Sequence, residues 1–228
     1  HDRARAPVEP SLAQAFYVGL TRDLVKVRTT PTADGIGWRV DLRLRPDPGA
    51  TAVSIDVDAA ISYYESLART WERAAFIRAR PVAGDLQIAN RFLTQIQPFI
   101  WRRTLDYTVM DDMKTMLSRP PQSHDWLGYN LKIGKNGIRQ LEFFTHVLQL
   151  VAGGREPGLR QHQTAPALHA LASFDWITTN QADALISAYL QLRRAEHRLQ
   201  MLADSQTHSL PRNPSDLAHF ANFMGHAE

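Results

Sequence analysis

Apolar residues recur every three or four positions through most of this 228-residue chain, and this spacing limits the fold more than any other feature. From about residue 56 onward it predicts one helix after another, each with an apolar face to bury. Leu12 and Phe16 begin a similar stripe in a helix predicted over 11–27, with Ser11 as its N-cap. We therefore expect a mostly helical protein, and the sequence contains no internal repeat or long heptad run.

Residues 38–45 are the exception, because apolar and charged side chains alternate strictly along them. Such a period of two predicts a β-strand with one buried and one polar face, and residues 51–55 offer a short partner strand. The polar face places three arginines around one acid. These residues are Arg39, Asp41, Arg43 and Arg45. The predicted fold class is therefore α+β, mostly α.

Composition excludes several classes of protein. Cysteine is absent, which removes disulfides and thiolate metal sites and suits a reducing compartment. No apolar run approaches the ~18 residues of a membrane span, so we expect a cytoplasmic protein that does not enter a membrane. The 26 Lys+Arg nearly balance the 23 Asp+Glu, and we expect no nucleic-acid binding from a net charge of +3.

The polar face of the predicted strand suits a polyphosphate with its divalent cation. Residues two apart on a strand lie about 6.6 Å apart on one face, so the carboxylate of Asp41 lies among guanidinium groups. The acid would hold Mg²⁺ while Arg39 and Arg45 neutralise phosphate charge. The alternative is a solvated strand face that pairs with a neighbouring helix, since a magnesium site normally needs a second carboxylate.

Two further segments carry candidate anion ligands. Along 69–85, Arg69, Arg73 and Arg80 lie on one side, before a helix that Asp85 caps. Lys132 lies in a glycine-containing loop that opens a helix, where free N–H groups attract anions. The alternatives are a charged surface helix for the first segment and a tight turn with an exposed lysine for the second.

Glu196 is the one acid within the apolar stripe of a long helix predicted to start at Asn180. A buried carboxylate needs a partner or a raised pKa, so we expect a structural ion pair with Arg193, Arg194 or a guanidinium from another helix. The helical spacing also continues over 105–116. The nine histidines show no zinc-binding spacing.

Five segments, taken together, resemble the glutamine synthetase adenylyltransferase family. They are GWRVDLRLRPDPG (37–49), YYESLARTWERAAFIRARPVAGD (63–85), NLKIGKNGIRQLEFF (130–144), LQLVAGGREPGLR (148–160) and RRAEHRLQMLADSQTHSLP (193–211). Members of this family are bifunctional enzymes that attach and remove AMP on a tyrosine of glutamine synthetase. Because the chain starts at His1 and matches only part of the family's pattern, we expect a segment of a longer protein.

The resemblance implies a particular domain organisation. In this family each half is a nucleotidyltransferase core followed by helices. Residues 1–83 are then the C-terminal part of a polymerase-β-like nucleotidyltransferase sheet, and residues 84–228 are a helical bundle. The sequences of these segments are similar to those of the family's N-terminal half. In this family that half removes AMP with phosphate and releases ADP. The alternatives are the half that attaches AMP from ATP, and a non-catalytic helical module that docks glutamine synthetase or the PII signalling protein.

The resemblance also implies residue roles. Family members hold two Mg²⁺ ions with three carboxylates, and Asp41 matches the third, with Arg43 beside it as a catalytic residue. The other two belong to an Asp-x-Asp strand that this chain lacks upstream of residue 11, so we expect the 228 residues alone to be inactive. Arg139 and Glu142 match a further family segment as site or hinge residues. Expected partners are glutamine synthetase and PII, with glutamine and 2-oxoglutarate as effectors.

Overall fold

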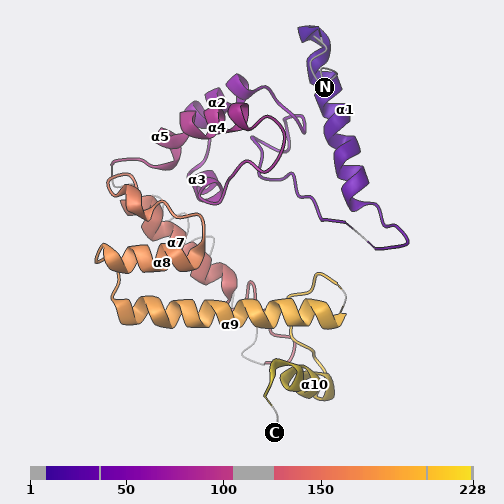
Figure 1. Cartoon of the computed structure of the whole chain (residues 1–228), viewed down its shortest axis with the longest axis vertical. Coiled ribbons are helices and arrows are strands. Elements are labelled where there is room, and N and C mark those ends of the chain that lie inside the picture. Colours follow the sequence, from indigo (N-terminus) through magenta and orange to yellow (C-terminus); the bar gives the residue numbers. More distant parts are fainter. Residues whose placement is uncertain (1–8, 36, 105–125, 204, 227–228) are drawn as a thin grey trace. The chain divides into compact units, whose positions relative to one another are not determined.

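The chain folds mainly into helices, as a computed structural model shows (Figure 1). The structure describes residues 9–35, 37–104, 126–203 and 205–226, so the helix predicted over 105–116 lies outside the described residues. Within these ranges no strand is found, and β-pairing is confined to two isolated bridges. None of the described helices is long and apolar enough to cross a membrane. The prediction of a mostly helical protein is confirmed.

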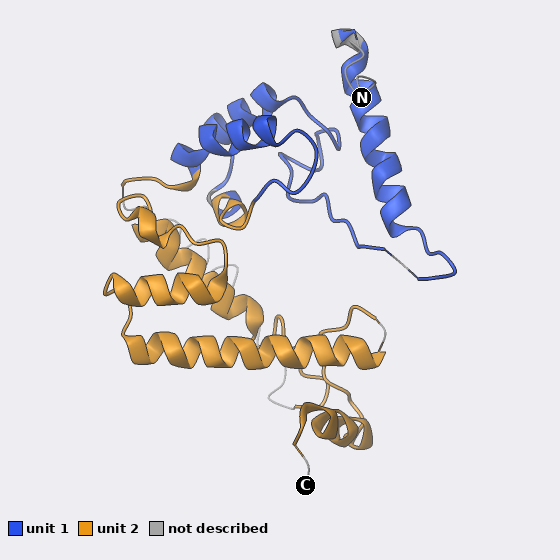
Figure 2. Ribbon diagram, in the orientation of Figure 1, with its two compact units in different colours: residues 1–72, 80–99 blue, residues 73–79, 100–228 orange. Residues whose placement is uncertain are grey.

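The chain divides into two compact units, one of residues 1–72 and 80–99 and one of residues 73–79 and 100–228 (Figure 2). The first unit contains α1 (Pro10–Thr29), α2 (Val57–Ser66), the start of α3 (Thr70–Phe76), α4 (Leu86–Gln95) and most of α5 (Gln97–Ile100). The second contains α7 (Ile138–Ala152), the 3₁₀-helix η2 (Pro157–Leu159), α8 (Thr164–Ser173), α9 (Thr179–Ala203) and α10 (Pro214–Met224). The domain boundary predicted at residue 83 stays a prediction.

The core of the first unit forms where α2 packs against α4. Asp56 and Asp85 begin these helices, because each side chain accepts hydrogen bonds from two free backbone N–H groups of the first turn. Asp85 is the cap predicted from the sequence. Tyr64 is buried between the two helices and contacts the rings of Phe92 and Phe99, with centroids 6.1 and 5.5 Å away. Edge-on and tilted ring contacts of this kind stabilise a small aromatic core.

The strand predicted over 38–45 is not formed, and neither is its partner over 51–55. A strand needs a neighbour that pairs with its N–H and C=O groups, and the described residues provide none here. The backbone turns instead, because the Arg45 guanidinium donates to the carbonyls of Leu42 and Pro48 at 2.7 and 2.8 Å. The two ends of the apolar face are left exposed, with Trp38 at 70% and Leu44 at 64%, whereas Val40 and Leu42 are part-buried. The predicted nucleotidyltransferase sheet is thus not found in the described residues.

Helix α1 has the predicted apolar stripe, but the stripe is not buried. Glu9 occupies the N-cap position and Pro10 the first turn, so the prediction of Ser11 as the cap is wrong. Each large apolar residue of the stripe is at least half exposed. These residues are Leu12, Phe16, Leu20, Leu24 and Val27. The helix therefore presents an apolar face that nothing in the described part of the first unit covers.

The second unit is a helical assembly in which α7, α8 and α9 pack on one another (Figure 1). Its core includes Leu141, Leu168 and Leu171. Helix α7 ends at Ala152 with Gly153 as its C-cap, and a Cβ on the next residue, Gly154, would collide with the backbone carbonyl of Arg102. Glycine is thus required at position 154, where these two backbones meet.

Helix α9 begins with a reciprocal cap. The Thr178 hydroxyl accepts from the Gln181 N–H at 3.2 Å, and the Gln181 side chain accepts from the Thr178 N–H at 2.9 Å. The prediction of Asn180 as the cap is therefore off by two residues. Helix α10, which the periodicity did not predict, starts from an Asn213 cap and packs through Phe220 against Leu199 of α9.

Candidate functional site

Asp41 and Arg43 form an exposed ion pair in the first unit. The Arg43 Nη2 lies 2.5 Å from Asp41 Oδ2, and its Nε lies 2.9 Å from Oδ1. The Arg43 backbone N–H also donates to Oδ1 at 3.0 Å. These hydrogen bonds from Arg43, together with the positive charges of Arg43 and Arg39, lower the pKa of Asp41 to about 2. Asp41 is therefore ionised at any physiological pH.

The three arginines of the predicted strand do not form one row. Arg43 binds Asp41, while Arg45 is part-buried and binds backbone carbonyls of the turn. Arg39 acts on Asp41 through its charge. The described residues contain no group of three or more His, Cys, Asp or Glu side chains placed to hold a metal. Asp41 offers a hard carboxylate of the kind that magnesium prefers, but both of its oxygens accept hydrogen bonds from Arg43, so its role as a metal ligand stays a prediction.

The arginines of the 69–85 segment lie in different surroundings. Arg73 is fully buried in the second unit, and its Nε donates to the carbonyl of Ile100 at 3.1 Å. Arg69 and Arg80 are exposed in the first unit. Helix α3 ends at Phe76, so these residues do not share one helical face.

The two candidates in the second unit lie near the start of α7. Asn130 Oδ1 accepts from the backbone N–H of Lys132, which fixes the loop before the helix. The Arg139 guanidinium lies over the ring of Phe143, 4.9 Å from its centroid. Neither residue belongs to the unit that contains Asp41. A common site for Asp41, Lys132 and Arg139 stays a prediction.

Glu142 joins a polar cluster of the second unit. Its Oε1 lies 3.0 Å from Arg78 Nη2 and accepts from the Tyr189 hydroxyl at 3.2 Å. Arg78 also donates to Thr164 Oγ1 at 2.5 Å. The contacts of Glu142 thus tie three elements together, α7, α9 and the segment after α3. His146 lies on α7 as well, and burial, with the nearby Arg78 charge, lowers its pKa to about 4.

The buried neutral His146 predicts a specific loss of stability in acid. The unfolded side chain takes up a proton near pH 6.5 and the folded one only near pH 4, so the unfolded state binds more protons between these values. Stability falls as pH drops through this window, by about 2 kcal/mol at pH 5 from this residue alone. We expect His146→Gln to remove this pH-dependent loss of stability. The free energy of unfolding in urea, measured for both proteins at pH 7.5 and 5, tests this. An equal pH dependence of the two proteins would contradict the assignment.

Glu196 is buried on α9 and carries the predicted ion pair. Arg193 Nη1 lies 2.7 Å from one carboxylate oxygen, and His208 Nδ1 lies 2.7 Å from the other. The prediction of a structural partner from Arg193 is confirmed. The sequence did not indicate His208, because it lies beyond the helix in a segment whose path only the fold determines.

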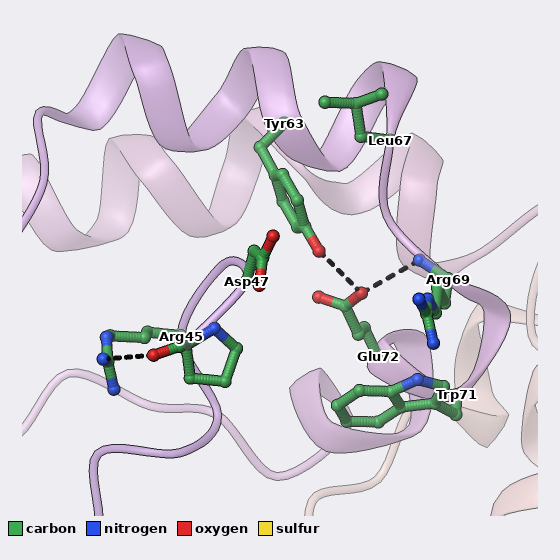
Figure 3. A pocket seen from close by; sticks show the side chains of 8 residues that line it. Arg45, Asp47, Tyr63, Leu67, Arg69, Trp71 and Glu72 are labelled. Atoms are coloured by element: carbon green, nitrogen blue, oxygen red, sulfur yellow. Dashed lines mark hydrogen bonds between the residues drawn. The ribbon is translucent and has the colours of Figure 1, made fainter. Parts of the chain in front are cut away.

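The first unit also contains a cavity of about 380 Å³ that sequence reasoning missed (Figure 3). Its lining residues come from the turn after residue 44, the end of α2 and the start of α3. They are Arg45, Asp47, Pro48, Tyr63, Leu67, Arg69, Trp71 and Glu72. Of these, Arg45 and Arg69 were sequence candidates for binding an anion. The cavity was not predictable because the 45–48 turn must fold back onto residues 63–72, and the one available signal was the cluster of aromatic and charged residues in 63–73.

A buried acid organises this cavity. Glu72 Oε1 accepts from the Tyr63 hydroxyl at 3.0 Å and from the Arg69 backbone N–H at 2.9 Å. Burial and the neighbouring Glu72 carboxylate raise the pKa of Tyr63, so its hydroxyl stays a hydrogen-bond donor. Asp47 enters from the turn with a positive φ of 31°, a conformation that Asp tolerates better than most residues. The site combines two acids, two guanidinium groups and an indole.

Two family models match the chain. Residues 4–95 match glutamate-ammonia ligase adenylyltransferase (GlnE), and residues 110–228 match GlnD PII-uridylyltransferase. Both descriptions are of nucleotidyltransferases, so this is the class to which the segment is related.

Curated relatives specify the family further. The chain is 48% identical to a protein of Xanthobacter autotrophicus, over 100% of this chain and 24% of the relative, and 46% identical to one of Bradyrhizobium sp. ORS 278, over 96% and 22%. Both are named bifunctional glutamine synthetase adenylyltransferase/adenylyl-removing enzyme. The chain belongs to this family, which confirms the resemblance, and spans about a quarter of the length of these relatives.

Proposed function

We propose that the chain is part of the deadenylylating half of a bifunctional enzyme that acts on glutamine synthetase. The observation that carries this proposal is the exposed, ionised carboxylate of Asp41 beside Arg43 and Arg39, in the segment that matches the adenylyltransferase family model. Such a group suits a magnesium-dependent transfer of a nucleotidyl group. The names of the relatives support glutamine synthetase as the protein substrate.

In the proposed reaction an oxygen of inorganic phosphate attacks the phosphorus of AMP that is bound to a tyrosine. The new P–O bond gives ADP, the P–O bond to tyrosine breaks, and the tyrosine oxygen takes up a proton. Mg²⁺ would neutralise charge on the phosphate oxygens and steady the leaving oxygen. Asp41 would provide one of its ligands, and Arg43 and Arg39 would balance phosphate charge near the reacting phosphorus. Two further carboxylates would come from the longer protein, and the 228 residues alone would then be inactive.

We propose further that residues 38–45 form a strand of a nucleotidyltransferase sheet in the longer protein. The exposed Trp38 and Leu44 support this proposal, as does the uncovered apolar stripe of α1. A strand supplied from outside this chain would pair with the segment and bury these side chains. Asp41, Arg43 and Arg45 would then share the opposite, polar face.

A second candidate function concerns the helical part of the chain. Residues 110–228 match a model named for an enzyme with a different protein substrate, the PII-uridylyltransferase. Helices that accompany two different nucleotidyltransferases suit a task common to both, such as docking a protein substrate or regulator. We propose glutamine synthetase or PII as the docked protein, with glutamine and 2-oxoglutarate as effectors.

Labelled phosphate tests the proposed reaction. The longer enzyme is incubated with adenylylated glutamine synthetase and ³²P-labelled inorganic phosphate. Phosphorolysis places the label in the β-phosphate of ADP, because the attacking oxygen belongs to the added phosphate. Release of unlabelled AMP would instead show hydrolysis and contradict the proposal.

A further inference from the structure

We propose that the cavity between the 45–48 turn, α2 and α3 binds the adenine base of the nucleotide, with Trp71 as the stacking surface and Glu72 as the acceptor for the amino group. This inference rests on the proposed function, because that function brings an AMP group to the first unit. The volume of about 380 Å³ lies in the usual range of small-molecule sites.

The walls of the cavity suit a flat ring. The Trp71 indole lines the cavity on one side of the Glu72 carboxylate, and the Tyr63 ring lies on the other side, with Leu67 beyond it (Figure 3). Bases stack on aromatic side chains because each has a broad π-face, and an indole offers the largest such surface. The Trp71 indole is half-buried and lies between the charged residues Arg69 and Glu72. A bound base could therefore displace water from the part of the indole that stays exposed.

The hydrogen-bonding groups select one kind of base. Glu72 is 6% exposed and uses Oε1 for Tyr63 and Arg69, whereas Oε2 receives no hydrogen bond from the described part of the chain. Figure 3 shows Oε2 on the Asp47 side of the cavity. One free acceptor suits the single exocyclic amino group of adenine. Guanine, which offers two adjacent donors, would need both oxygens.

The cavity adjoins the segment that carries Asp41. Arg45 lines the cavity, and its Nη1 donates to the carbonyl of Leu42, the residue after Asp41. The Arg69 guanidinium also lines the cavity and makes no hydrogen bond or ion pair within the described residues. It is therefore available to the ribose or the phosphate. A base in the cavity would leave the phosphate close to the proposed reaction site.

Equilibrium binding of AMP and IMP to the 228-residue chain tests this assignment, measured by isothermal titration calorimetry. IMP carries a carbonyl in place of the amino group and would meet the Glu72 carboxylate with an acceptor. We expect AMP to bind at least tenfold more tightly than IMP. Trp71→Leu should weaken AMP binding roughly tenfold or more, and Trp126→Leu, at an exposed tryptophan of the second unit, should not change it.

Arg69→Gln provides a second variant, since its exposed side chain can change without disturbing the backbone N–H that binds Glu72. It should weaken AMP binding several-fold and leave adenosine binding unchanged if the guanidinium meets the phosphate. Absence of AMP binding, equal binding of AMP and IMP, or unchanged binding by a folded Trp71→Leu protein would each overturn the proposal. If one of these binding results is found and the longer enzyme still forms labelled ADP from labelled phosphate, the proposed function stands and only the assignment of the cavity is rejected.

Discussion

Replacing Asp41 with Asn in the longer enzyme is expected to lower phosphate-dependent formation of ADP from adenylylated glutamine synthetase at least ~1,000-fold. Asn keeps the size of the side chain but removes the negative charge that would hold the cation. The pKa of about 2 means that this charge is present throughout the assay range. Because Asp41 is exposed, the thermal unfolding temperature should stay unchanged. The measurement is initial rates with labelled phosphate.

The control for this variant is Asp34→Asn, which neutralises another exposed acid of the same unit, in the turn closed by Thr32 and Gly35. Its rate should match that of the unchanged enzyme. Measuring ATP-dependent attachment of AMP on the same proteins assigns the half. Loss of phosphorolysis with attachment retained would place Asp41 in the removing half. Loss of attachment alone would place it in the other half, and two unchanged rates would favour a non-catalytic module.

Local spacing predicted most of the helices correctly. The i, i+3 and i, i+4 patterns indicated the helices around Tyr64 and Leu141, and they placed Glu196 inside an apolar stripe with Arg193 three residues before it. Such inferences succeed because the interacting groups are close in sequence. The cap of α9 was misplaced by two residues, since Thr178 and Asn180 are both good N-caps and the hydrogen bond to Gln181 decides between them.

Features that depend on distant segments were not predictable in the same way. The alternation over 38–45 specifies a strand only when another strand pairs with it, and the described residues supply no such partner. The cavity needs Asp47 and Trp71 to meet from separate segments. The burial of Arg73 was missed because its spacing to Arg69 fits a surface face equally well, and only packing against the Ile100 segment removes it from water.

Replacing Arg73 with Ala is expected to reduce the free energy of unfolding by about 3–5 kcal/mol. The side chain is fully buried, and its Nε donates to the carbonyl of Ile100. Truncation would leave a cavity the size of several methylene groups and a buried carbonyl without its donor. Arg73→Met would restore much of the volume but not the hydrogen bond, so its loss should be intermediate. Urea unfolding followed by circular dichroism measures all three proteins.

Arg80→Ala is the matched control, because Arg80 is an exposed arginine of the same sequence segment. Its free energy of unfolding should change by less than about 0.5 kcal/mol, as for most surface positions. An arginine that binds phosphate would behave in the opposite way, since its removal weakens phosphate binding and leaves the fold intact. If Arg73→Ala and Arg80→Ala unfold at the same urea concentration, Arg73 has no structural role, and its role in binding phosphate becomes the better interpretation. A large loss confined to Arg73→Ala would assign the guanidinium to the core, where it holds the carbonyl of Ile100.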